Sequence, residues 1–197
     1  DDTAQRAGQV SLDPIPHIAR EPIGMVLLPI LTLAFIGWPL GFASAPYDPV
    51  WADRYPRRAG WMALAGPAAN LLLFLLAAAG LRWGLASGLF QAPEVLSVYS
   101  VAETAGSAVG RSLAIFLSLV FVQNLLLMIF NLIPVAPLDG SAAAALVLPS
   151  RAFATYSRLM SQPGMSIIGL VLAWNVFDRL FYPAYRAAID LVYAGTL

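Results

Sequence analysis

Long stretches without any charged residue dominate this sequence and limit what it can fold into. Four of them stand out, at residues 22–47, 59–81, 112–138 and 159–177. A charge at the centre of a bilayer costs about 2.5–3.5 kcal/mol on insertion scales, and a spanning helix needs about 20 mostly apolar residues. The four stretches therefore predict membrane-spanning segments.

The composition narrows the class further. Hydrophobic residues make up 59% of the 197 positions and charged residues 11%, whereas a soluble domain carries about 25% charged residues. The formal net charge is zero, so we expect no nucleic-acid partner. With no cysteine, disulfides and cysteine-ligated zinc are excluded. The single histidine, His17, excludes a multi-histidine metal site built from this chain alone.

These features predict an all-α polytopic helical bundle with three or four spanning segments in a lipid bilayer. Arginines gather in the loops 48–58 and 139–158, while the longer segment 82–111 holds two arginines at its ends with two glutamates between them. The positive-inside rule then places 48–58 and 139–158 in the cytoplasm. Segments 59–81 and 112–138 become an antiparallel pair.

Prolines interrupt the pattern at both ends of the chain. The stretch 22–47 contains Pro29 and the run Gly37-Trp38-Pro39, which fits either a kinked span or a re-entrant hairpin. Both alternatives stay open. The last twenty residues mix aromatic and charged side chains, so we expect an interfacial helix after a break at Pro183.

The segment 121–140, FVQNLLLMIFNLIPVAPLDG, is the most informative. As a helix, residues 112–138 would be about 40 Å long, which exceeds a hydrocarbon core of about 30 Å. Because Pro134 and Pro137 cannot donate backbone hydrogen bonds, we expect the helix to end near Leu132. The irregular segment would then deliver Asp139 either to a functional site or to the solvated interface.

Three asparagines also lie in the apolar stretches. Asn124 and Asn131 are seven residues apart and share a helix face, and Asn70 shares a face with Gly66. Asparagine amides in membrane helices hydrogen-bond between helices and allow close packing beside small residues. These residues are therefore either structural or part of a functional site.

Several motifs together resemble the site-2 protease family of intramembrane zinc metallopeptidases. FNLIPVAPLDG is similar to its Asn-x-x-Pro-x-x-Pro-Leu-Asp-Gly signature, and AGPAAN at 65–70 to its Ala-Gly-Pro-x-x-Asn helix start. The stretches GQVSLDPIPHIAREPIG at 8–24 and GWPLGFASAPYDPVWADRYPRRAG at 37–60 resemble segments of the short branch, which lacks additional domains. Where that branch has Lys-Pro in the connector, this chain has Ala45-Pro46. The resemblance covers about residues 1–150.

The resemblance implies a function for the chain and a site within it. Asp139 matches the family's third zinc ligand, while the His-Glu-x-x-His helix, which supplies two ligands and the general base, is absent from the 197 residues. We expect that helix upstream, so Zn²⁺ would bind only together with it and this chain alone would be inactive. The substrates would be transmembrane or membrane-proximal segments of other proteins.

The resemblance also assigns supporting roles. Pro134 and Pro137 would shape the turn, and Asn70, Asn124 and Asn131 would support it or bind an extended substrate. His17 matches a family histidine and is either structural or near the substrate. A short extended segment is expected at 8–16 near the active site, with a core at 1–150 and a C-terminal spanning helix plus interfacial helix at 151–197.

Two other functions remain compatible with parts of the pattern. A catalytically inactive pseudoprotease could act as a membrane scaffold on the same fold, and an upstream His-Glu-x-x-His motif would argue against it. An unrelated channel or transporter subunit would be expected to carry charges within its spans or inverted repeats, and the sequence shows neither.

Overall fold

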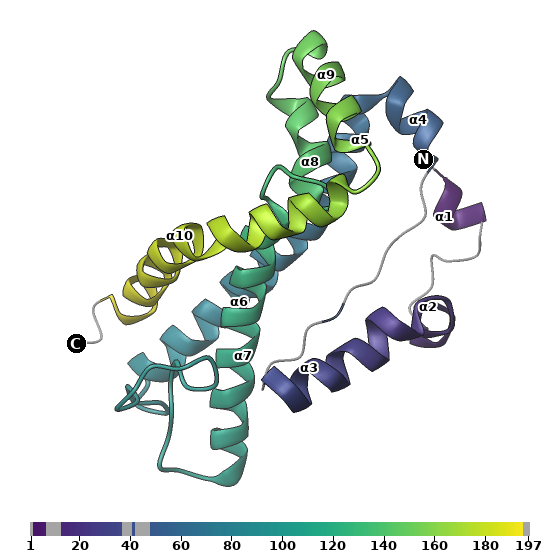
Figure 1. Cartoon of the computed structure of the whole chain (residues 1–197). Coiled ribbons are helices and arrows are strands. Elements are labelled where there is room, and N and C mark those ends of the chain that lie inside the picture. Colours follow the sequence, from purple (N-terminus) through teal and green to yellow (C-terminus); the bar gives the residue numbers. More distant parts are fainter. Residues whose placement is uncertain (1, 7–12, 37–40, 42–47, 195–197) are drawn as a thin grey trace. The chain divides into compact units, whose positions relative to one another are not determined.

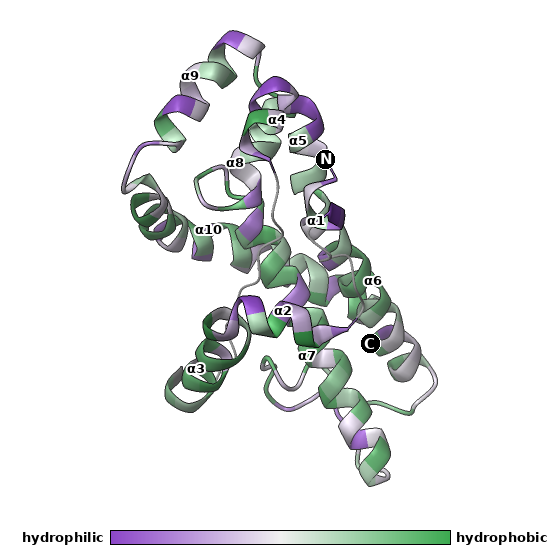
Figure 2. Ribbon diagram, turned by 90° about the vertical axis from the view of Figure 1, so that its right-hand side faces the viewer, coloured by the Kyte–Doolittle hydropathy of each residue, from purple (hydrophilic) through white to green (hydrophobic). Residues whose placement is uncertain are grey.

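Three helices are long and apolar enough to cross a membrane, which confirms the all-α membrane fold. A fourth span is possible if one bent helix pair near the N-terminus counts as a single span. The hydrophobic colour in Figure 2 runs along most of helices α6 (Ala65–Ala86) and α7 (Ala108–Asn131), whereas α9 (Ser150–Met160) carries hydrophilic patches. The three spans are Pro56–Ala86, Ala108–Asn131 and Met165–Tyr193.

The computed structural model describes residues 2–6, 13–36, 41 and 48–194 (Figure 1). The chain divides into two compact units, residues 1–55 and residues 56–197. We call them unit 1 and unit 2 and describe each by itself. The division at residue 150, expected from the resemblance, stays a prediction.

Unit 1 contains short helices and one sharp bend. The Asp13 side chain accepts a hydrogen bond from the Ile15 amide (3.0 Å) and so caps α2. α2 and the helix that follows meet at 106°, where Glu21 and Pro22 separate them. The elements are α1 (Thr3–Arg6), α2 (Pro14–Arg20), a π-helical turn (Ile23–Leu27), α3 (Leu28–Ile36) and α4 (Pro49–Arg54).

Two sequence-based expectations for unit 1 need comment. The extended segment expected at 8–16 is wrong for its C-terminal part, because α2 begins at Pro14, where a proline at the first helical position needs no donor. Residues 8–12 and the Gly37-Trp38-Pro39 run lie outside the described residues. Pro29 lies within α3, and the bend comes earlier, before Pro22.

Unit 2 is built on an antiparallel pair of helices, α6 (Ala65–Ala86) and α7 (Ala108–Asn131). The Phe74 and Phe121 rings pack with centroids 4.9 Å apart. Farther along, an ideal Cβ on Gly80 would lie 3.3 Å from Leu117. The predicted pairing of 59–81 with 112–138 is therefore confirmed.

α5 (Pro56–Ala63) leads into α6 through a break at Leu64. Pro67 explains the break, since it has no amide to donate to the carbonyl of Ala63. The chain continues in a helical direction because the Leu64 amide still bonds the Gly60 carbonyl (3.1 Å). α5 packs against α8 (Asp139–Ala143) and the 3₁₀ turn that follows it, Ala144–Leu146.

The C-terminal region differs from the expectation in two respects. The apolar stretch at 159–177 does not form one helix, because α9 (Ser150–Met160) ends inside it and α10 (Met165–Tyr193) begins after Gly164, whose φ of 82° suits glycine. The break expected at Pro183 is also absent, and α10 continues through it. Stacked rings hold the helix on both sides of the proline, at Phe177, Phe181 and Tyr185.

The end of unit 2 remote from α8 is held by hydrogen bonds between distant segments. The Ser118 hydroxyl accepts the amides of Val101 and Ala102 (3.0 and 3.4 Å), and the Tyr193 hydroxyl donates to the Val101 carbonyl (2.5 Å). Arg82 donates to the Leu191 carbonyl (2.8 Å). These bonds attach α10 and the 87–107 connection to the α6–α7 pair.

We expect a cysteine pair at Gly80→Cys and Leu117→Cys to crosslink in membranes, because their side chains meet across the α6–α7 interface. The chain has no cysteine of its own, so the readout is unambiguous. The matched control is Leu75→Cys with Leu117→Cys, since Leu75 is 46% exposed. Equal crosslinking of both pairs, measured by gel mobility after mild oxidation, would contradict the pairing.

Candidate functional site

An irregular segment of seven residues, 132–138, connects α7 to α8. α7 ends at Asn131, as the paired prolines predict. Inside the segment, short-range bonds replace the helical ones: the Val135 amide bonds the Ile133 carbonyl (2.8 Å) and the Leu138 amide bonds the Val135 carbonyl (2.9 Å). We call residues 132–138 the proline turn.

Gly140 allows the proline turn to reverse direction tightly. An ideal Cβ at this position would lie 2.5 Å from the Ile133 carbonyl oxygen and 2.6 Å from the Leu132 carbonyl carbon. Backbone atoms cannot move aside as a flexible side chain can, so only glycine fits. The Leu-Asp-Gly sequence therefore has a local structural reason besides any chemistry.

Asp139 is the first residue of α8 and its side chain is half-buried. Its Oδ2 atom lies 3.2 Å from an ideal Cβ on Gly66 in α6. The two segments that resemble family motifs, AGPAAN and PLDG, thus meet in space. A larger residue than glycine at position 66 would have to push the carboxylate away.

The surroundings of the Asp139 side chain disfavour its charged form. Asp139 lies outside the three candidate spans, and burial raises the pKa of its carboxyl above the ordinary value. Within the described residues, no hydrogen-bond donor or cation pairs with this carboxylate. A bound cation would offset the cost of keeping it charged.

An apolar cluster packs the proline turn against α10. Ile133 and Leu138 are buried against Ala173 of α10. Around them pack Phe130, Val135 and Phe177, and the rings of Phe130 and Phe177 meet edge to face with centroids 5.7 Å apart. Gly169 of α10 contacts the carbonyl of Ala136 closely. The turn therefore rests on α10 by apolar contact.

The three asparagines differ in their surroundings. Asn124 is buried and its amide donates to the Val120 carbonyl of its own helix (2.8 Å), which is a structural contact. The side chains of Asn70 and Asn131 are half-buried and have no hydrogen-bond partner among the described residues. Their side-chain amides are therefore available to a ligand.

His17 and the prolines complete the set of predicted residues. His17 lies on α2 of unit 1 and is half-buried, and its backbone carbonyl accepts the Glu21 amide (3.1 Å). The structure does not place it relative to Asp139. Pro134 and Pro137 lie in the proline turn, and the Ala136–Pro137 peptide bond is cis.

Sequence reasoning missed two residues that contact the proline turn, Tyr156 and Met160 of α9. The Tyr156 hydroxyl donates to the Pro134 carbonyl (2.8 Å), and burial raises the pKa of Tyr156, so the phenol stays protonated at neutral pH. The Ala136 amide donates to the Met160 sulfur (3.5 Å). Their spacing of four residues on an amphipathic segment is the signal that could have revealed them.

The described residues do not form a zinc site by themselves. No group of three or more His, Cys, Asp or Glu side chains gathers anywhere in the described ranges. A protein zinc site uses three or four protein ligands. This part of the chain supplies one suitable carboxylate, Asp139, in the surroundings described above.

Comparisons with known proteins define the class. The family model described as "Peptidase family M50" matches residues 32–173. The chain therefore belongs to peptidase family M50, the site-2 protease family, and is an integral membrane protein.

One curated relative is described as "Putative zinc metalloprotease YwhC" from Bacillus subtilis (strain 168). It is 32% identical over 141 residues, which cover 71% of this chain and 54% of the relative. The chain thus spans about half the length of that protein. No solved structure matches the chain.

We expect Gly140→Ala to destabilise unit 2 by about 1–3 kcal/mol, the usual cost of overpacking, because its Cβ would overlap backbone carbonyls. Gly110→Ala is the matched control, since its Cβ would make ordinary contacts at 3.4 and 3.5 Å. Both glycines are helical, so helix propensity alone would favour alanine equally at each. Similar thermal unfolding midpoints for the two variants in detergent would contradict the packing argument.

Proposed function

We propose that this chain is part of an intramembrane zinc metalloprotease in which Asp139 supplies one ligand to the metal. The observation that carries the proposal is the contact between the Asp139 carboxylate and Gly66, which brings the two motif segments together. Family membership and the printed name of the Bacillus relative support the reaction class. The substrates would be transmembrane or membrane-proximal segments of other proteins.

Zinc would need ligands from outside the described residues. The resemblance to the site-2 protease family expects two histidines from a His-Glu-x-x-His helix. We therefore propose hydrolysis for a protein that carries that motif and expect none from the 197-residue chain alone. A catalytically inactive scaffold on the same fold is the alternative that the experiment below distinguishes.

The residues of this chain have definable tasks in such a protein. The proline turn and α8 hold the Asp139 carboxylate against α6. The apolar cluster around Ile133 and Leu138 excludes water from one side of the turn. A helical substrate hides its carbonyls in internal hydrogen bonds, so it has to unwind before cleavage. The amides of Asn70 and Asn131 could then bind the extended strand.

We also propose that the loops 48–58 and 139–158 are cytoplasmic. In unit 2 the α8–α9 end carries the exposed residues Arg57, Arg58, Arg151 and Arg158. Glu94 and Glu103 belong to the 87–107 connection at the opposite end. Arg82 and Arg111 lie in α6 and α7 on either side of that connection, so the proposal rests on the arginines of the short loops 48–58 and 139–158, to which the positive-inside rule applies.

The topology can be measured with single cysteines in the cysteine-free chain. We expect Ser97→Cys to react with a membrane-impermeant thiol reagent added outside cells, and Thr155→Cys to react only after the membrane is opened. Both positions are exposed, so accessibility of the side chain itself does not decide the result. The reverse labelling pattern would contradict the proposed orientation.

The proposed ligand is tested in a protein that includes the His-Glu-x-x-His segment. We expect Asp139→Ala to lose stoichiometric zinc and to abolish cleavage of a membrane substrate, because one of three protein ligands is removed. Asn70→Ala and Asn131→Ala should lower zinc affinity or activity by a smaller factor, about 10–100-fold. Metal analysis and a cleavage assay on the same preparation measure both effects.

The control is Glu94→Ala, an exposed acid on the 87–107 connection. It should keep both zinc and activity. Zinc bound by the intact long protein without any cleavage would favour the inactive scaffold. Full activity of the Asp139→Ala variant would show that the assignment of Asp139 as a zinc ligand is wrong.

A further inference from the structure

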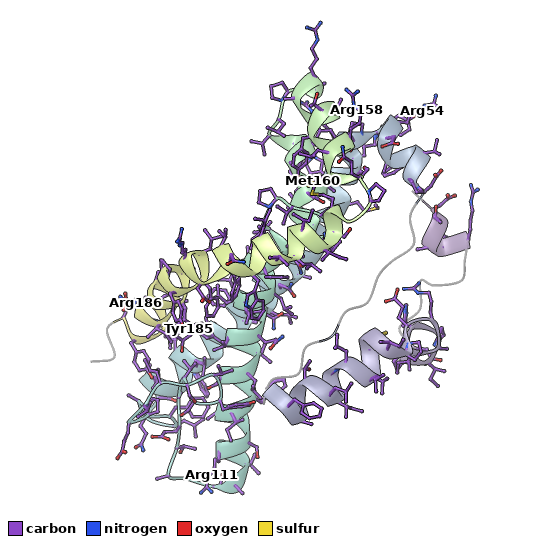
Figure 3. All side chains as sticks on the ribbon, in the orientation of Figure 1. Arg54, Arg111, Arg158, Met160, Tyr185 and Arg186 are labelled. Carbon is purple, nitrogen blue, oxygen red and sulfur yellow. The ribbon has the colours of Figure 1, made fainter. Side chains whose placement is uncertain are left out.

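One face of α9 contacts the proline turn, and the opposite face is exposed. The half-buried residues follow a helical spacing of three and four, and the rest of the helix is exposed. The exposed face carries Arg151 and Arg158, and Figure 3 shows Arg158 and Met160 at the end of unit 2 opposite Arg111. The half-buried residues are Phe153, Tyr156, Ser157 and Met160.

The contact of Tyr156 supplies a hydrogen-bond donor to a carbonyl that the proline turn leaves without a backbone partner. Within the described residues no backbone amide donates to the Pro134 carbonyl, because the Leu138 amide bonds Val135 instead. The Tyr156 hydroxyl supplies the donor at 2.8 Å. A hydroxyl bond is directional, so it fixes the orientation of the Pro134–Val135 peptide group.

The contact of Met160 supplies an acceptor to the amide of Ala136, two residues after Pro134. The Ala136 amide has no carbonyl acceptor in the described part of the chain and donates to the Met160 sulfur at 3.5 Å. A thioether is a weak acceptor, and methionine is flexible enough to fill an irregular gap. Tyr156 and Met160 are four residues apart, so one helix face binds two peptide groups of the turn.

The contacts of α10 with the same turn are different in kind. Gly169 and Ala173 touch the turn only through van der Waals contact, which limits its approach but does not orient its peptide groups. On the other side, Gly66 is near the Asp139 carboxylate but donates nothing to it. The directional bonds to residues 134–136 in the described structure thus come from within the turn and from α9.

We propose that Tyr156 and Met160 are positioning residues, through which α9 fixes the proline turn and thereby the place of the Asp139 carboxylate beside Gly66. Asp139 follows Ala136 by three residues, so a shift of the Ala136 peptide is passed along a short, tightly bonded segment. The importance of this placement for catalysis rests on the proposed function, in which Asp139 binds zinc.

The test measures the placement directly, without metal or activity. In the 197-residue chain in membranes, Gly66→Cys with Asp139→Cys forms a local reporter, whose crosslinking rate with a short bifunctional thiol reagent reports the α6–turn distance. Gly80→Cys with Leu117→Cys forms a remote reporter in the middle of the α6–α7 pair. Each reporter is combined separately with Tyr156→Phe or Met160→Leu, which preserve most of the side-chain volume.

We expect each substitution to slow the local reporter and to leave the remote reporter unchanged. For Tyr156→Phe the expected slowing is at most about five-fold, the change in the equilibrium constant between the placed and the displaced turn that loss of one neutral hydrogen bond of ordinary strength produces. For Met160→Leu it is smaller, because sulfur is the weaker acceptor. Tyr182→Phe and Met62→Leu, two exposed residues of the same types, should change neither reporter.

Each outcome decides the matter for the residue concerned. Slowing of both reporters to the same extent would show a general loss of stability and overturn the positioning role. An unchanged local reporter would overturn it as well. Because neither reporter needs zinc or proteolysis, failure here is distinct from failure of the proposed function, which the Asp139→Ala experiment tests.

Discussion

The structure of unit 2 depends on the two backbone donors that Pro134 and Pro137 remove. A helix continued past Asn131 would leave the carbonyls of Phe130 and Ile133 without their usual partners. The chain instead turns, and the Ile133 amide bonds back to Phe130 while Ile133 accepts the Val135 amide. The remaining polar groups of the turn need partners from elsewhere, and α9 provides two of them. The missing amide hydrogens of Pro134 and Pro137 thus create polar groups that α9, a distant segment, has to satisfy.

Small residues let the surrounding helices approach this turn. Gly140 admits the carbonyls of Leu132 and Ile133, Gly169 admits that of Ala136, and Gly66 admits the Asp139 carboxylate. A side chain at Gly140 or Gly169 would overlap backbone atoms of the turn, whereas one at Gly66 would only displace the Asp139 carboxylate slightly. At the remote end, by contrast, the helices are joined by hydrogen bonds from Arg82 and Tyr193. Close backbone packing at one end and hydrogen bonds at the other together fix the relative positions of α6, α7 and α10.

Much of this arrangement could be predicted from the sequence, because its causes are local. The absence of charge identifies the two core spans, and the prolines place the end of α7 within a residue of the expected position. Asp139 could be singled out by the motif FNLIPVAPLDG around it, since Asp48 and Asp178 also follow charge-free, proline-containing runs directly. The absence of charge could not show that α9 ends at Met160 and α10 begins after Gly164, both inside the stretch 159–177, since neither helix terminus needs a charged residue.

Other features depend on tertiary contacts that no local pattern reveals. Pro183 would end an isolated helix, yet stacked aromatic rings on both sides of it, at Phe177, Phe181 and Tyr185, support α10. The spacing of Tyr156 and Met160 on an amphipathic segment could have singled them out, but which carbonyl and amide they face is a tertiary contact. Tyr156 lies outside the charge-free stretches, whereas Met160 lies at the start of the stretch 159–177.

The lengths of the helices determine where Asp139 lies relative to the bilayer. Arg111 is in the first turn of α7, and the twenty residues from there to Asn131 rise about 30 Å, the thickness of a hydrocarbon core. On α6, the sixteen residues from Gly66 to Arg82 rise about 24 Å. If both arginines mark the remote boundary, the two helices place the carboxylate within a few ångströms of the opposite boundary. The proposed hydrolysis consumes water, and a carboxylate at this depth would need only a short path for water from the surface; the half-burial of Asp139 agrees with such a place.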